Sequence, residues 1–82
     1  MKKAIVIGAT SGIGLEVARL LAKRGYIVGV AGRRVDRLEE IVKRNENIKD
    51  YRQIDVTDAA APQQLNELIA ELGGMDLYFH SS

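Results

Sequence analysis

The stretch at residues 4–14 constrains the fold of this chain more than any other. Residues 4–7, Ala-Ile-Val-Ile, run directly into a glycine-rich turn, after which an amphipathic pattern begins. A short apolar run rich in β-branched residues predicts a strand that is buried on both faces, as in a parallel sheet. A strand that turns at glycines into a helix leaves backbone N–H groups unpaired at the positive end of the helix dipole, where phosphates bind. We therefore expect an anion-binding turn here.

The three glycines of this turn have separate expected roles. Gly8 lets the chain turn sharply off the strand, Gly12 lets a phosphate approach the backbone, and Gly14 lets the helix pack closely. The spacing Gly-x-x-x-Gly-x-Gly differs from the general dinucleotide fingerprint because Val17 stands where its third glycine would follow. A Walker loop is excluded because no Gly-Lys-Ser/Thr follows. An ordinary tight turn between strand and helix is the alternative.

The rest of the chain alternates between short apolar runs typical of strands and amphipathic patterns typical of helices. Strands are expected at 4–7, 26–31, 49–56 and 75–80. Helices are expected from Ile13, from a cap at Asp36, and from a first turn containing Pro62. The first helix is expected to present one apolar face made of Ile13, Val17, Leu20 and Leu21. This alternation predicts an α/β fold with three layers: a Rossmann-type parallel sheet of four strands in order 3-2-1-4, with three helices.

Composition narrows the class of protein. The net charge is +1 and acidic and basic residues are mixed, so neither nucleic acid nor an anionic membrane is an expected partner. The chain has no cysteine, which excludes disulfides and thiolate metal sites and fits a cytoplasmic location. Residues 1–82 are expected to form one domain.

The end of the second strand indicates which dinucleotide fits. An NAD site usually offers Asp or Glu here, whereas this chain offers Gly32, Arg33 and Arg34. A guanidinium can hold a 2′-phosphate that a carboxylate would repel, so NADP(H) is favoured over NAD(H). The missing acid also argues against an S-adenosylmethionine methyltransferase. Arg33 is the favoured contact of the 2′-phosphate. The alternative is that Arg33, Arg34 and Arg37 form a solvated basic patch at the start of a helix.

The sequence Gly8-Ala9-Thr10-Ser11-Gly12-Ile13-Gly14 resembles the cofactor loop of the short-chain dehydrogenase/reductase family. The resemblance covers the whole chain and implies that Asp55-Val56 contacts the adenine amino group. For Asp55, a role as a turn or capping residue is the alternative. The expected cofactor-binding residues are Gly8, Thr10, Ser11, Gly12, Ile13, Gly14, Arg33, Arg34, Asp55 and Val56.

The sequence departs from the family pattern at its end. The family usually closes its fourth strand with Asn-Asn-Ala-Gly, where this chain has His80-Ser81-Ser82. His80 is either a contact of the cofactor ribose or a hydrogen-bonded structural residue.

The family's catalytic serine and Tyr-x-x-x-Lys pair lie after its fifth and sixth strands. None of the three tyrosines here has a lysine four residues later, so no catalytic residue and no metal ligand is assigned. We expect the N-terminal part of an NADP-dependent reductase, truncated before the fifth strand and inactive alone. Its parent would transfer hydride between NADPH and a carbonyl or alcohol substrate.

Two other readings keep the same fold. A non-catalytic dinucleotide-binding sensor or scaffold is one, and a flavodoxin-like or receiver module is the other. A receiver needs an acidic cluster after the first strand, which Gly8-Ala9-Thr10 does not supply. Truncation also predicts an exposed sheet edge at the fourth strand, and hence self-association or a homo-oligomer.

Overall fold

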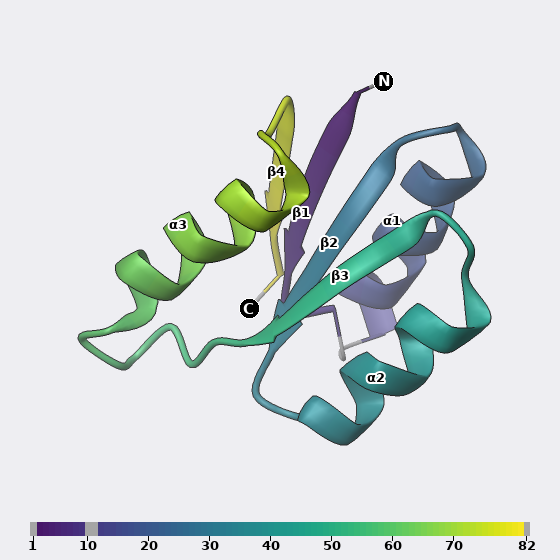
Figure 1. Ribbon diagram of the computed structural model, residues 1–82. Coiled ribbons are helices and arrows are strands. Elements are labelled where there is room, and N and C mark those ends of the chain that lie inside the picture. Colours follow the sequence, from purple (N-terminus) through teal and green to yellow (C-terminus); the bar gives the residue numbers. More distant parts are fainter. Residues whose placement is uncertain (1, 10–11, 82) are drawn as a thin grey trace.

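The computed structural model describes residues 2–9 and 12–81. Its four strands form one parallel sheet in the order β3-β2-β1-β4, and helices cover both faces (Figure 1). The elements in chain order are β1 (Lys3–Ile7), α1 (Gly12–Lys23), β2 (Ile27–Gly32), α2 (Val35–Arg44), β3 (Ile48–Gln53), α3 (Ala61–Leu72) and β4 (Leu77–His80). The predicted Rossmann-type α/β class and the strand order 3-2-1-4 are confirmed.

The sheet separates two hydrophobic clusters because successive side chains of each strand point to opposite faces. Val6 and Val30 pack with Leu38 under α1 and α2, whereas Ile5 packs with Leu68 under α3. All five side chains are buried. The central strand β1 is therefore covered on both sides, as its apolar run predicts, and its carboxyl end is held rigidly in the middle of the sheet.

The predicted inward face of α1 is confirmed for Val17 and Leu21, which pack against the core, and is wrong for Ile13 and Leu20. Ile13 is 69% exposed and Leu20 is 52% exposed, whereas the buried residues of the helix are Gly14, Ala18 and Ala22. These three small residues recur at every fourth position, so they form a narrow stripe that lets the helix axis approach the sheet. The larger apolar residues are displaced to the flanks of the helix by this close approach.

Several predicted boundaries also change. Asp36 lies within the first turn of α2, and Arg34 occupies the capping position without a side-chain hydrogen bond. β3 ends at Gln53 because the chain turns away after Ile54, whose N–H donates to the Gly32 carbonyl at 2.9 Å. Pro62 lies in the first turn of α3, as predicted.

Polar contacts of side chains connect both sides of the sheet to neighbouring elements. Arg52 of β3 bonds to Glu67 and Glu71 of α3, which holds this helix over the β3 edge. On the side of β4, the backbone N–H of Lys3 in β1 donates to Oδ2 of Asp76, the residue before β4, at 2.8 Å. Within the part of the chain that the structure describes, no helix has the length and apolar character needed to cross a membrane.

Candidate functional site

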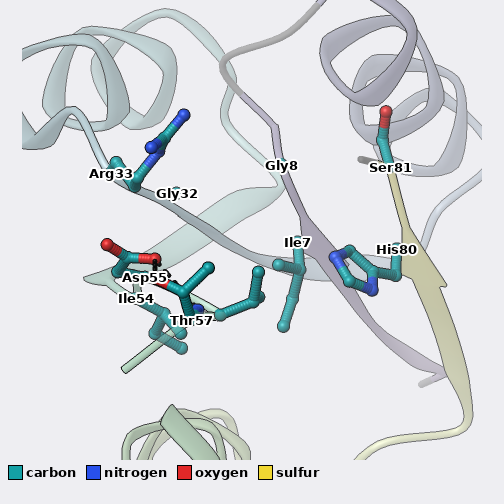
Figure 2. A pocket seen from close by; sticks show the side chains of 10 residues that line it. Ile7, Gly8, Gly32, Arg33, Ile54, Asp55, Thr57, His80 and Ser81 are labelled. Carbon is teal, nitrogen blue, oxygen red and sulfur yellow. Dashed lines mark hydrogen bonds between the residues drawn. The ribbon is translucent and has the colours of Figure 1, made fainter. Parts of the chain in front are cut away.

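A pocket of about 350 Å³ opens at the carboxyl ends of the strands (Figure 2). The chain leaves β1 toward β2 on one side, while β4 lies on the other side, so this is the point at which the strand order reverses. Ligands of open α/β sheets bind at such a crevice. The lining residues are Ile7, Gly8, Gly32, Arg33, Ile54, Asp55, Val56, Thr57, His80 and Ser81.

Gly8 begins the turn between β1 and α1. Its φ of +81° lies in the left-handed region, which confirms the sharp turn predicted there. Its N–H donates to the Ala31 carbonyl at 2.8 Å, and a Cβ at this position would clash with the Ser81 backbone. Gly8 therefore fits where β1, β2 and the end of β4 meet, and no other residue would fit without displacing them.

The other two glycines of the motif lie at the start of α1. A Cβ on Gly14 would lie 2.8 Å from the Gly8 carbonyl carbon, so the helix packs against the turn itself. Apart from its chain neighbours and the backbone of its own helix, no described residue has an atom within 4 Å of a Cβ built on Gly12, and Ile13 beside it is exposed. Two further predicted cofactor residues, Thr10 and Ser11, lie outside the described residues.

The two predicted arginines are not equivalent. Arg33 lines the pocket directly after β2, and its carbonyl accepts a 3.2 Å hydrogen bond from Gln53 Nε2. Arg34 is exposed and is not one of the residues that line the pocket. Figure 2 places Arg33 and Asp55 on one side of the pocket and His80 on the other. Both arginine side chains are exposed, and of the two it is Arg33 that lines the pocket.

Asp55 forms the first residue of a tight turn after β3. Its Oδ1 accepts hydrogen bonds from the Thr57 hydroxyl at 2.7 Å and the Thr57 N–H at 3.0 Å. These two bonds, with the nearby Arg33, hold the pKa of the Asp55 carboxyl below its usual value. Asp55 therefore acts as a turn residue through its Oδ1, as the alternative expected. Among the described residues, none donates a hydrogen bond to its Oδ2.

Replacing Thr57 with valine is expected to raise the pKa of Asp55 toward its usual value, because the stronger of the two donors is lost. A carboxyl whose pKa is lowered by folding stabilises the protein above the pKa it has when unfolded, and this contribution is lost as the pH falls. The stability of Thr57→Val should therefore depend less on pH than that of the unaltered chain, over the acid range in which the Asp55 carboxyl takes up a proton. Carbon NMR of the Asp55 carboxyl measures the midpoint directly. Thr57→Ser keeps the hydroxyl and is the control; an unchanged midpoint in Thr57→Val would contradict the assignment.

The structure also adds residues that sequence reasoning missed. Thr57 holds Asp55, and the spacing Asp-x-Thr, typical of an Asx turn, was a usable signal for it. Ser81 donates its N–H to the Ile7 carbonyl at 2.9 Å, which extends the β1–β4 ladder into the site. Among residues 2–9 and 12–81, no group of three His, Cys, Asp or Glu side chains could hold a metal ion.

Comparison with known proteins gives the family. The chain is 35% identical over 85 residues to an uncharacterized oxidoreductase of Staphylococcus aureus strain MRSA252, covering 99% of this chain and 36% of that protein. It is 40% identical over 82 residues to an uncharacterized oxidoreductase of Listeria monocytogenes serovar 1/2a, covering 95% of this chain and 33% of that protein. The chain thus spans about a third of the length of these curated relatives.

The chain is also similar in structure to solved oxidoreductases. A variant of the actinorhodin polyketide ketoreductase, solved with NADPH, matches with a TM-score of 0.86 and 32% identity, over 99% of this chain and 33% of that one. An alcohol dehydrogenase from the archaeon Thermococcus sibiricus, complexed with 5-hydroxy-NADP, matches with a TM-score of 0.85 and 32% identity, over 95% and 35% of the two chains. The short chain dehydrogenase family model matches residues 2–81. The chain therefore belongs to the short chain dehydrogenase family.

Proposed function

We propose that residues 1–82 are the N-terminal dinucleotide-binding part of an oxidoreductase that uses NADP(H) in preference to NAD(H). The observation that carries this proposal is the pocket at the strand-order reversal, with Arg33 on its wall directly after β2. No acidic residue stands at that position to receive the 2′-hydroxyl of NAD or to repel a 2′-phosphate. The two related structures described above hold NADPH and 5-hydroxy-NADP, which supports the same preference.

Three groups of residues would each hold a different part of the dinucleotide. The first turn of α1 at Gly12 and Ile13 would hold the pyrophosphate through backbone N–H groups and the helix dipole, and Gly8 and Gly14 would shape the turn beside it. Thr10 and Ser11 would belong to the same turn. Arg33, with Arg34 in a secondary role, would bind the 2′-phosphate. Asp55 and Val56 would meet the adenine edge, since Asp55 Oδ2 has no donor among the described residues.

The chemistry of the parent protein would be hydride transfer between NADPH and a carbonyl or alcohol substrate. The bound nicotinamide supplies the hydride. None of the ten proposed binding residues is assigned to proton transfer, so we propose that this chain alone binds the cofactor without turning over substrate. A cytoplasmic location, where NADPH is available, is part of the same proposal.

Calorimetric titration of this chain with 2′,5′-ADP and separately with 5′-AMP tests the proposal. Both ligands carry the adenosine 5′-phosphate, and the first adds a phosphate at the 2′ position. We expect the 2′-phosphorylated ligand to bind at least about tenfold more tightly, as a charge-assisted contact to an arginine implies. Equal affinities would contradict the NADP preference, and no binding to the folded chain would contradict the site itself.

We further propose that this chain self-associates through β4. β4 is an edge strand, and its exposed side chains include Leu77 and Tyr78. An exposed apolar edge without a charge or proline is a template for pairing with another chain. Sedimentation at increasing concentration should show dimers or larger species, and Tyr78→Lys should return the chain to monomer. Gln53→Lys, on the opposite edge, is the control. A stable monomer at high concentration in the unaltered chain would contradict this proposal.

A further inference from the structure

Gln53 is the last residue of β3, and its side chain reaches the loop that carries Arg33. Its Nε2 donates a 3.2 Å hydrogen bond to the Arg33 carbonyl. Gln53 is the register partner of Gly32, the last residue of β2, so this bond joins the ends of two neighbouring strands. Gln53 is not one of the residues that line the pocket. It therefore contacts the loop of Arg33 from outside the proposed ligand site.

The alternation of side chains along β3 places Gln53 on the face of the sheet that carries α2. Tyr51, two residues earlier, packs against the cluster under α1 and α2, and Gln53 points to the same side. Arg52, between them, points to the opposite face, where it bonds to Glu67 and Glu71 of α3. The loop after β2 leads into α2, so Gln53 lies on the side toward which this loop runs.

The Arg33 carbonyl differs from its two neighbours in the group that holds it. The Gly32 carbonyl accepts from the Ile54 N–H at 2.9 Å, and the Arg34 carbonyl accepts from the Leu38 N–H at 3.1 Å. The first bond continues the ladder between β2 and β3, and the second belongs to the first turn of α2. Between these two backbone bonds, a side chain holds the Arg33 carbonyl. A single substitution can therefore release this peptide group while both backbone bonds remain.

The direction of the Arg33 side chain depends on this part of the backbone. The side chain is exposed, so packing restricts its direction little. Its Cα–Cβ bond and the rotamers that the backbone allows then decide where the guanidinium can lie. A backbone that is already fixed also reduces the conformational freedom that is lost when the guanidinium binds a phosphate. Holding the Arg33 peptide group therefore favours the contact that Arg33 makes.

We propose that Gln53 is a positioning residue that strengthens the preference of the site for a 2′-phosphate, by holding the backbone of Arg33. This inference rests on the proposed function, because it concerns the arginine that would bind that phosphate. Gln53 acts through the Arg33 peptide group and does not contact the ligand. Its effect is confined to ligands with a 2′-phosphate, because other residues of the proposed site meet the 5′-phosphate and the adenine.

Amide NMR of the ligand-free chain tests the contact itself. Gln53→Met keeps the length of the side chain and removes the donor. The Arg34 N–H belongs to the same peptide group as the Arg33 carbonyl, so we expect its signal to shift in this variant. Gln63→Met makes the same change on the exposed surface of α3 and should leave the Arg34 signal in place. An unchanged Arg34 signal in Gln53→Met would overturn the inference.

Calorimetry with 2′,5′-ADP and 5′-AMP tests the effect on the preference. In Gln53→Met we expect the affinity for 2′,5′-ADP to fall about threefold, the effect of one hydrogen bond between neutral groups, and the affinity for 5′-AMP to stay unchanged. Gln63→Met should alter neither value. An equal loss for both ligands would show a general disturbance of the fold, and no loss for 2′,5′-ADP would show no role. Either result would overturn the inference.

Combining Gln53→Met with Arg33→Ala shows whether the glutamine acts through the arginine. In Arg33→Ala we expect Gln53→Met to cause no further loss of affinity for 2′,5′-ADP, because the guanidinium that it positions is gone. A further threefold loss would overturn the inference. If the unaltered chain prefers 2′,5′-ADP and Gln53→Met keeps the full preference, this inference is wrong and the proposed function stands. If the unaltered chain binds both ligands equally, both are wrong.

Discussion

Replacing Gly14 with alanine is expected to lower the free energy of unfolding by about 3 kcal/mol, the upper part of the range for an overpacked site. The added Cβ would lie 2.8 Å from the Gly8 carbonyl carbon and 3.1 Å from Ala9 Cα. Both neighbours are backbone atoms held by hydrogen bonds to Ala31, so they cannot move aside as a flexible side chain would. Because small domains are stabilised by only about 5 kcal/mol, the variant should keep about 2 kcal/mol of stability, which leaves roughly a few per cent of its molecules unfolded. Urea denaturation followed by circular dichroism measures the loss.

Gly12→Ala is the matched control for this prediction. It also introduces one methyl group into the first turn of α1, but this group meets no described residue within 4 Å apart from its chain neighbours and its own helix backbone. Its stability should stay within about 1 kcal/mol of the unaltered chain, since alanine is the better helix former. Its affinity for NADP⁺ should fall, because the new methyl group occupies the approach of the phosphate. Equal stability of both variants would contradict the close packing described for Gly14.

Replacing Arg33 with alanine is expected to abolish the preference for the 2′-phosphorylated ligand. Arg33 lines the pocket directly after β2, where a guanidinium can form two charge-assisted hydrogen bonds to a phosphate. We expect the affinity for 2′,5′-ADP to fall by about tenfold or more, the effect of losing a hydrogen bond to a charged group. The affinity for 5′-AMP should change little. Calorimetry with both ligands gives the two values.

Arg34→Ala serves as the control for charge. It removes the same positive charge from the next residue along the chain, where the side chain does not line the pocket. Its effect on the affinity for 2′,5′-ADP should be smaller, because an exposed charge acts only through screened attraction. If the two variants lost affinity equally, the preference would come from general basicity and the specific role of Arg33 would be wrong.

The sequence was sufficient to predict the order of the strands, the parallel sheet and the turn at Gly8. Alternation of strands and helices restricts the topology strongly, and it does not depend on details of packing. The inward face of α1 could not be predicted in the same way. The pattern of Ile13 and Leu20 favours burial of the largest side chains, whereas the close approach at Gly14 and Ala18 favours small ones. The distance between helix and sheet, which decides between these, is a property of the folded chain.

The residues of the site also divide into those that the sequence predicted and those that it did not. Arg33 and Asp55 were expected together because the carboxyl ends of parallel strands meet at one edge of the sheet, and both line the pocket. Of the two consecutive arginines, Arg33 was favoured from the sequence, and it is the one that lines the pocket. Thr57 was missed because its role depends on the hydrogen bonds of Asp55, although the spacing between them is a recognisable turn signal.

The proposed dinucleotide site lies at the carboxyl ends of the strands of this chain. Amide NMR of the isotope-labelled chain, titrated with NADP⁺, locates the bound ligand residue by residue. We expect the shifted signals to cluster at Gly8, at Gly12–Gly14, at Gly32 and Arg33, and at Asp55 and Val56. Another pocket lies between the ends of α1 and α2, at Arg19, Lys23 and Arg44. Shifts clustered there would contradict the proposed site, as would the absence of any shift in folded protein.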